Sequence, residues 1–142
     1  MKYLLDTDHL SIIQRKTGRD YANLSNRMNQ YPRSDFALSI VTFHEQLLGA
    51  HTYISRARRP DQIVTGYMIM SRLARDFTAL PLIAFDRAAM RTFQSLQAQN
   101  IQLKTMDLRI ASIAVSRGLI LLTRNTQDFR KVPDLLIEDW TI

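Results

Sequence analysis

A small set of acidic and amide side chains falls where apolar runs end or where helices begin. The set comprises Asp6, Glu45, Asp107, Asn125 and Asp128. Three or four carboxylates that meet in one cleft repel each other unless a cation neutralises them. Their oxygens are hard ligands of the kind that Mg²⁺ and Mn²⁺ prefer. If folding brings these side chains together, the sequence predicts a divalent-metal site.

The charge of the whole chain indicates what such a site would act on. The chain carries 19 Lys and Arg against 13 Asp and Glu, a net charge of +6, and arginines outnumber lysines. Arginine suits bidentate contacts with phosphate, so a polyanion, with nucleic acid first, is the expected partner. A divalent ion can orient water, lower its pKa and stabilise charge on a phosphate. An acidic metal cleft in a basic protein therefore predicts a nuclease.

Each acid also has a purely structural interpretation when it is considered alone. Asp8 suits the N-cap of a helix, and Asp107 does as well. Glu45 is the fourth residue of a stretch that starts at Thr42, which matches a capping box. Asp6 fits such roles least, because a carboxylate directly after a buried apolar strand is costly to desolvate unless it is paired or metal-bound.

The elements that must position these residues alternate along the chain. The expected strands cover residues 2–5, 36–41, 80–84 and 119–122, with an edge strand at 135–138. The expected helices cover residues 8–16, 20–30, 42–55, 60–76, 86–99 and 107–118. This alternation predicts an α/β fold whose mainly parallel central sheet is flanked by helices. Since strand carboxyl ends share one edge of such a sheet, acids from distant segments can converge there.

Length and composition limit the remaining options. At 142 residues we expect one domain, spanning residues 1–142. The chain has no cysteine, so it has no disulfide or thiolate site, which is compatible with a cytoplasmic location. No apolar run approaches the roughly 20 residues that span a bilayer, and we expect no membrane association. The three histidines form no metal-binding motif, and His9 is expected to be a surface or packing residue.

Four stretches, in this order, resemble the PIN-domain ribonucleases and particularly the VapC toxins of bacterial toxin–antitoxin pairs. They are KYLLDTDHL at the start, ALSIVTFHEQLLGA, MDLRIASIAVSRGLILLTRNTQDF, and VPDLLIEDW near the end. The order, the spacing and the total length also agree with that family. The resemblance spans nearly the whole chain, although residues 52–80 carry no diagnostic motif.

The resemblance implies a Mg²⁺- or Mn²⁺-dependent endoribonuclease. In that interpretation Asp6 and Asp107 hold the metal directly, and Glu45 binds it through water or orients the attacking water. The family's fourth acidic place is variable, and here it is Asn125. Asn125 and Asp128 are expected to complete the surroundings of the metal.

The same resemblance implies macromolecular partners. RNA is the implied substrate, and a cognate antitoxin is expected to insert a segment near the acidic cleft, often presenting an arginine. The helical hairpin of residues 43–76 is the candidate antitoxin contact. Homodimerisation is also expected from the family.

Two other functions stay open on the sequence. Asp6 and Asp8 form a D-x-D pair after an apolar strand, as in haloacid-dehalogenase-like phosphatases, but Leu10 replaces the usual downstream hydroxyl and no later GDxxxD pair follows. The second alternative is a catalytically inactive PIN-like module that binds RNA or protein, which Asn125 in place of an acid favours.

Overall fold

The computed structural model describes all residues, 1–142, and its centre is a sheet of five parallel strands. The strands are β1 (Tyr3–Leu5), β2 (Phe36–Ser39), β3 (Leu82–Ile83), β4 (Ile120–Leu122) and β5 (Ile137–Glu138). Their order across the sheet is β3-β2-β1-β4-β5, so β1 is central and β5 is an edge strand. The prediction of an α/β fold with a parallel sheet is confirmed.

Seven helices surround the sheet. They are α1 (Thr7–Arg15), α2 (Arg19–Met28), α3 (Ile40–Ser55), α4 (Pro60–Asp76), α5 (Arg87–Ala98), α6 (Thr105–Arg117) and α7 (Thr126–Phe129). A 3₁₀ turn at Arg33–Asp35 precedes β2. Gly118 ends α6 in the left-handed conformation, with a φ of 65°, as its sequence position predicts.

The N-terminal ends of α1, α3 and α6, which lie near acidic candidate residues, come before the positions expected from the sequence. Asp6, not Asp8, is the N-cap of α1. Helix α3 begins at Ile40, because the buried Ser39 hydroxyl accepts hydrogen bonds from two backbone amides at 2.9 and 3.2 Å. Glu45 thus lies beyond the first turn, and its assignment to a capping box was wrong. Helix α6 begins two residues before Asp107, which is therefore not its N-cap.

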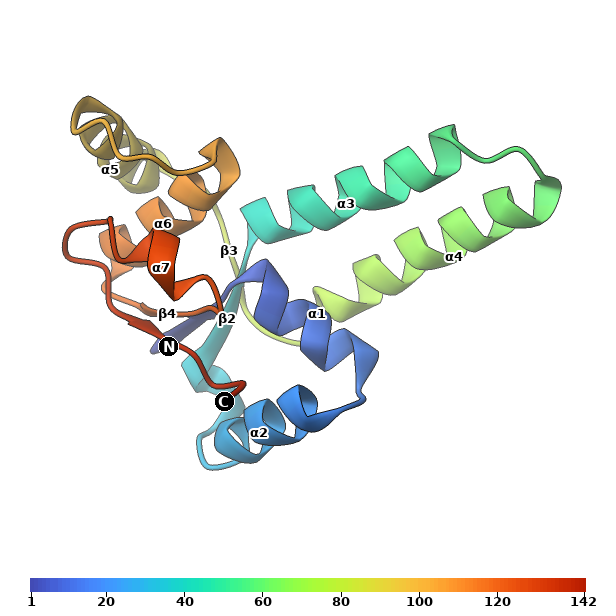
Figure 1. Cartoon of the computed structure of the whole chain (residues 1–142), viewed down its shortest axis with the longest axis horizontal. Helices are drawn as coiled ribbons and strands as arrows, with labels where there is room; N and C mark the ends of the chain where they lie inside the picture. Colours follow the sequence, from blue (N-terminus) through green and yellow to red (C-terminus); the bar gives the residue numbers. More distant parts are fainter.

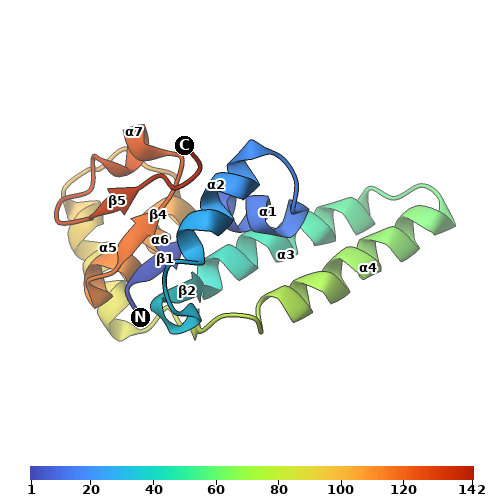
Figure 2. The ribbon, with the colours of Figure 1, turned by 90° about the horizontal axis from the view of Figure 1, so that it is seen from below.

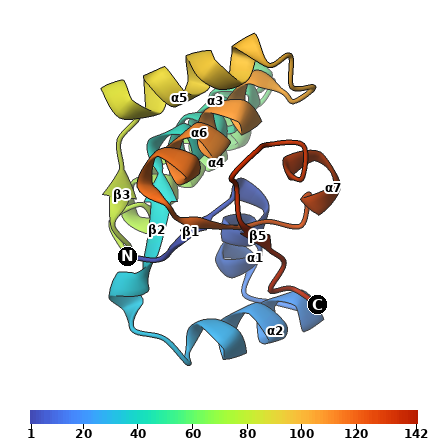
Figure 3. The same ribbon diagram turned by 90° about the vertical axis from the view of Figure 1, so that its left-hand side faces the viewer.

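The alternation of side chains along each strand divides the core into two clusters, one on each face of the sheet. Leu4 faces the cluster that includes α5 and α6. Tyr3 and Leu5 face the other cluster, which includes residues of α1, α2 and α4 together with the buried Trp140. Figure 3 shows α5 and α6 on one side of the strands and α1 and α2 on the other. Both faces of β1 are therefore covered by helices.

Helices α3 and α4 form an antiparallel hairpin that extends away from the sheet (Figures 1 and 2). Gly66 of α4 is buried against α3, where a side chain would collide with Ile54 and Tyr53. Exposed apolar side chains occur along the hairpin, including Leu48, Val64 and Tyr67. None of the helices combines the length and the apolar character needed to cross a membrane.

Candidate active site

The candidate site lies at the carboxyl edge of the sheet, around the end of β1. Leu5 pairs with Leu38 of β2 on one side and with Leu122 of β4 on the other. The backbone amide of Asp6 donates to the Leu122 carbonyl at 2.9 Å, so Asp6 sits between the two neighbouring strand ends. The strand order reverses next to β1, and open α/β sheets bind ligands at such a point.

Asp6 is buried, with a relative exposure of 6%. Its Oδ1 accepts the Thr7 backbone amide at 2.8 Å, and its Oδ2 accepts the Thr123 hydroxyl at 2.8 Å. Burial and the charges of Asp8 and Asp107 raise the pKa of Asp6 to about 7, against the lowering effect of the two hydrogen bonds. The side chain is thus fixed in place, and a cation would favour its charged form.

Glu45 is held beside the same strand end by the first residue of α1. The Thr7 hydroxyl donates to Glu45 Oε1 at 2.8 Å, and the hydroxyls of Thr7 and Thr42 lie 3.2 Å apart. Thr7 therefore contacts Asp6 through its backbone and Glu45 through its side chain. This single residue connects the end of β1 with α3.

Asp107 joins the set from the first turn of α6. Burial raises its pKa, the charge of Glu45 raises it next, and Asp128 and Asp8 add to this effect, while Lys104 opposes it. Because α6 leads back into β4, its N-terminal end lies at the carboxyl edge of the sheet. The charges of Glu45 in α3, Asp128 in α7 and Asp8 in α1 all act on Asp107, and the charge of Asp107 acts in turn on Asp6, which follows β1.

Asn125 and Asp128 lie after β4 and pair with each other. The Asn125 amide donates to Asp128 Oδ2 at 3.2 Å, and Lys131 Nζ lies 3.3 Å from Asp128 Oδ1. These two contacts lower the pKa of Asp128. The Thr123 hydroxyl accepts the Asn125 backbone amide at 3.0 Å, which ties this turn to the partner of Asp6. A role for either residue around a metal stays a prediction.

A second layer of contacts beneath the acids was not foreseen from the sequence. Asp8 accepts hydrogen bonds from the His9 ring and from the Arg124 backbone amide. His9 is fully buried and also accepts the backbone amide of Trp140. The prediction that His9 is a surface or packing residue is correct in its second option. Ile12, three residues after His9 on the same helix, is also buried, and this helical spacing is the sequence signal for the burial of His9.

A divalent cation suits the chemistry of these residues, although its ligands are not gathered in advance. No three side chains of His, Cys, Asp or Glu are arranged to hold a metal ion. The carboxylates of Asp6, Glu45 and Asp107 are nevertheless hard oxygen donors at one edge, and mutual repulsion contributes to the raised pKa of Asp6 and of Asp107. A bound cation would reduce this repulsion between the carboxylates.

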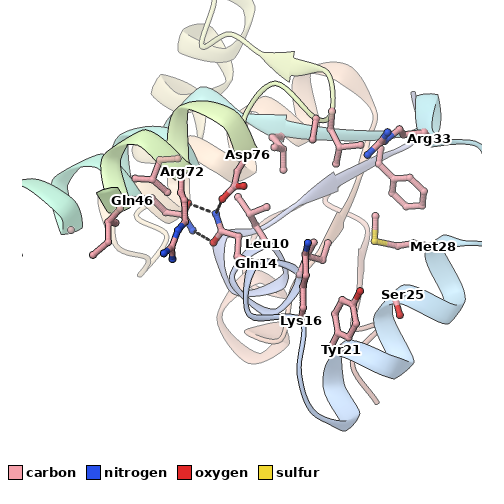
Figure 4. A pocket seen from close by; sticks show the side chains of 18 of the residues that line it. Leu10, Gln14, Lys16, Tyr21, Ser25, Met28, Arg33, Gln46, Arg72 and Asp76 are labelled. Carbon is pink, nitrogen blue, oxygen red and sulfur yellow. Dashed lines mark hydrogen bonds between the residues drawn. The ribbon is translucent and has the colours of Figure 1, made fainter. Parts of the chain in front are cut away.

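A large groove lies apart from the acidic edge, between α1 and α2 on one side and the α3–α4 hairpin on the other (Figure 4). Its volume is about 1280 Å³, and Asp6, Glu45 and Asp107 do not line it. Gln14, Gln46 and Asp76 form a hydrogen-bonded group on its wall. Both polar and apolar side chains line the groove, and the candidate catalytic residues lie outside it.

Comparison with known sequences gives relatives over the full length, although no family model matches the chain. The chain is 27% identical over 144 residues to the tRNA(fMet)-specific endonuclease VapC of Salmonella typhimurium, covering 99% of this chain and 98% of that protein. It is 28% identical over 142 residues to ribonuclease VapC2 of Rickettsia felis, covering 99% and 98%.

Solved structures show the same fold. The DNA-bound VapBC complex of Salmonella typhimurium contains a chain that matches with a TM-score of 0.75 and 23% identity, over 99% of this chain and 98% of that one. VapBC-1 of nontypeable Haemophilus influenzae matches with a TM-score of 0.75 and 20% identity, over 100% of both chains. The resemblance stated from the sequence motifs is confirmed: this chain is similar along its whole length to VapC ribonucleases and has the PIN-domain fold of VapC toxins.

Proposed function

We propose that this protein is a metal-dependent endoribonuclease that acts as the toxin of a toxin–antitoxin pair. The observation that carries the proposal is the position of Asp6, Glu45 and Asp107 at the carboxyl edge of the sheet, where Thr7 contacts both Asp6 and Glu45 and the charge of Glu45 acts on Asp107. The names of the full-length relatives, an endonuclease and a ribonuclease, support it. The net charge of +6 suits an RNA substrate.

In this proposal Asp6 and Asp107 would hold Mg²⁺ or Mn²⁺. When bound, the ion supplies positive charge next to the phosphodiester and lowers the pKa of nearby water. Thr7 fixes Oε1 of Glu45, so that Glu45 can orient the attacking water and take up its proton. Thr123 holds Asp6, which keeps this carboxylate aimed at the edge.

We further propose an antitoxin partner and a cytoplasmic site of action, where RNA is available. The solved neighbours are VapBC complexes, which supports a protein partner of this kind. The hairpin of residues 43–76 lines one wall of the large groove and is the proposed contact. Homodimerisation stays a prediction, for which gel filtration at high protein concentration is the direct measurement.

The test is incubation of the protein with total RNA in Mg²⁺ or Mn²⁺, with and without EDTA, and in parallel with p-nitrophenyl phosphate. We expect discrete RNA fragments that require the metal and no turnover of the small ester. Turnover of the ester with intact RNA would favour the phosphatase alternative. Metal binding with no turnover of either substrate would favour an inactive binding module.

A further inference from the structure

The buried His9 has its protonation pattern fixed by its neighbours. The backbone amide of Trp140 lies 3.2 Å from Nε2, and a backbone amide can only donate, so Nε2 is an acceptor. Nδ1 lies 2.8 Å from Asp8 Oδ1, and it must therefore carry the proton and donate to this carboxylate. Asp139 Oδ1 is 3.8 Å from Nε2, beyond hydrogen-bond distance, and already accepts from Thr141.

The far oxygen of Asp8 holds the turn that follows β4. Asp8 Oδ2 accepts the Arg124 backbone amide at 2.9 Å, and it lies 3.3 Å from the Thr123 hydroxyl that donates to Asp6. Asn125 is the next residue of this turn. Asp8 thus reaches the turn that carries the hydrogen-bond donor of Asp6 on one side and the Asn125–Asp128 pair on the other.

The other end of this chain of contacts is rigid. Trp140 is fully buried, and its ring packs against Tyr3 and Tyr31 at centroid distances of 4.7 and 5.5 Å. Its backbone is therefore a fixed point for the imidazole of His9. A hydrogen-bonded path runs from the C-terminal segment through His9 and Asp8 to the turn at the acidic edge.

We propose that His9 is a positioning residue for the active site: by donating from Nδ1 to Asp8, it orients that carboxylate so that Asp8 fixes the turn at Thr123–Asn125 beside Asp6. The effect on catalysis rests on the proposed nuclease function. The hydrogen-bond path itself does not, so the two can be tested separately.

Two amide substitutions separate the two bonds of the imidazole. In His9→Asn the side-chain amide can take the place of Nδ1 and donate to Asp8, but it is too short to reach Trp140. In His9→Gln the terminal amide can take the place of Nε2 and accept from Trp140, but it leaves Asp8 without this donor. Both variants lose one hydrogen bond of a buried side chain, and Asn, the smaller residue, leaves the larger cavity, so a merely structural role predicts that His9→Asn is at least as impaired as His9→Gln.

We expect His9→Gln to lower kcat for RNA cleavage by about 10-fold, the low end of the range found when direct partners of metal ligands are removed, because His9 acts through Asp8 and the turn, with KM little changed. His9→Asn should recover most of this loss. A cavity variant in the core of α5, Leu96→Ala, controls for lowered stability, and it should keep its kcat at temperatures well below its Tm. Equal kcat values for the Asn and Gln variants would overturn the proposal.

NMR spectroscopy provides a readout that needs no activity. In the wild type the ring nitrogens of His9 should show a proton on Nδ1 only, and the Arg124 amide should exchange slowly with solvent. In His9→Gln the Arg124 amide should exchange faster, whereas in His9→Asn it should stay protected. A proton on Nε2, or unchanged Arg124 exchange in His9→Gln, would refute the path even if the wild type cleaves no RNA. Absence of RNA cleavage with the NMR pattern intact would instead contradict the proposed function.

Discussion

Asp6 combines burial with a position next to other acids, and this costs free energy when its carboxyl ionises. Two hydrogen bonds, from Thr7 and Thr123, favour the charged form, yet the pKa of Asp6 stands at about 7 because burial and the charges of Asp8 and Asp107 outweigh them. In the unfolded chain the same group has an ordinary aspartate pKa near 3.8. Between about pH 3.8 and about pH 7, the carboxyl of Asp6 is therefore protonated in the native protein and ionised in the unfolded chain.

This difference predicts how stability depends on pH in the absence of metal. Between the unfolded pKa and the native pKa the native state binds more protons, so the free energy of unfolding falls as pH rises, by at most about 1.4 kcal/mol per pH unit for this group. The contribution of protonated Asp6 is fully present below the unfolded pKa and is lost as pH passes about 7. Asp6→Asn should weaken this dependence and should be the more stable protein at about pH 8.

Urea denaturation in EDTA, at about pH 5 and about pH 8, measures this effect. Asp35→Asn is a suitable control, because Asp35 lies far from the acidic edge, next to the N-terminus. If the free energies of unfolding of the wild type and of Asp6→Asn fall equally as the pH rises, the native pKa of Asp6 is not raised.

For individual residues, the sequence predicts which acids lie at the same edge of the sheet, but not which residues form hydrogen bonds with them. Asp6 could be chosen because it follows a strand, and Glu45 and Asp107 because they lie near the N-terminal ends of helices, and parallel topology brings such positions to one edge. The His9–Trp140 contact joins residues 131 positions apart. No local pattern encodes such a contact, so the path beneath the acids became visible only in the fold.

At the scale of elements, the α3–α4 hairpin offers a matched pair of glycines. At Gly66 a methyl group would collide with the Ile54 side chain, and β-branched residues have little freedom to move aside. At Gly49 of α3 nothing lies within 4 Å of the added carbon. Gly66→Ala should destabilise by about 1–3 kcal/mol through overpacking, whereas Gly49→Ala should stabilise by about 0.8–1 kcal/mol through helix propensity.

Chemical denaturation of the two variants measures this contrast, and circular dichroism checks that their helix content is unchanged. Stabilisation by Gly66→Ala would mean that the two helices of the hairpin do not pack as closely as described.

The elements themselves were mostly predictable, and the errors have a local cause. Residues 36–41 read as one apolar strand, but β2 ends at Ser39 because its hydroxyl caps α3. Apolar residues after Ser39 look alike in a buried strand and in the first turn of a buried helix, so periodicity alone does not separate them. The sequence does not mark the start of α6, because its N-cap residue, Lys104, accepts no hydrogen bond through its side chain.

At the scale of the whole molecule, the positive charge predicts a salt-dependent substrate affinity. Net charge is +6, although the candidate site is acidic, so in the proposed function the RNA backbone would contact cations elsewhere on the surface. If about three phosphates of a single strand are neutralised, KM should rise about 20-fold between roughly 50 and 200 mM NaCl, with kcat less affected. Steady-state cleavage of a short RNA at several salt concentrations measures this, with Tm over the same range as the control for folding. A KM that does not change with salt concentration would contradict electrostatic binding of RNA.

In the proposed function, carboxylates from distant segments act together as one nuclease site. The most direct measurement is metal-dependent RNA cleavage by Asp6→Asn and Asp107→Asn beside the wild type and Asp61→Asn. Asp61 is an exposed acid in the first turn of α4, far from the acidic edge. We predict loss of cleavage in the first two variants, retained folding in both, and wild-type activity in Asp61→Asn. Full cleavage by a well-folded Asp6→Asn or Asp107→Asn protein would contradict a role of these carboxylates in catalysis.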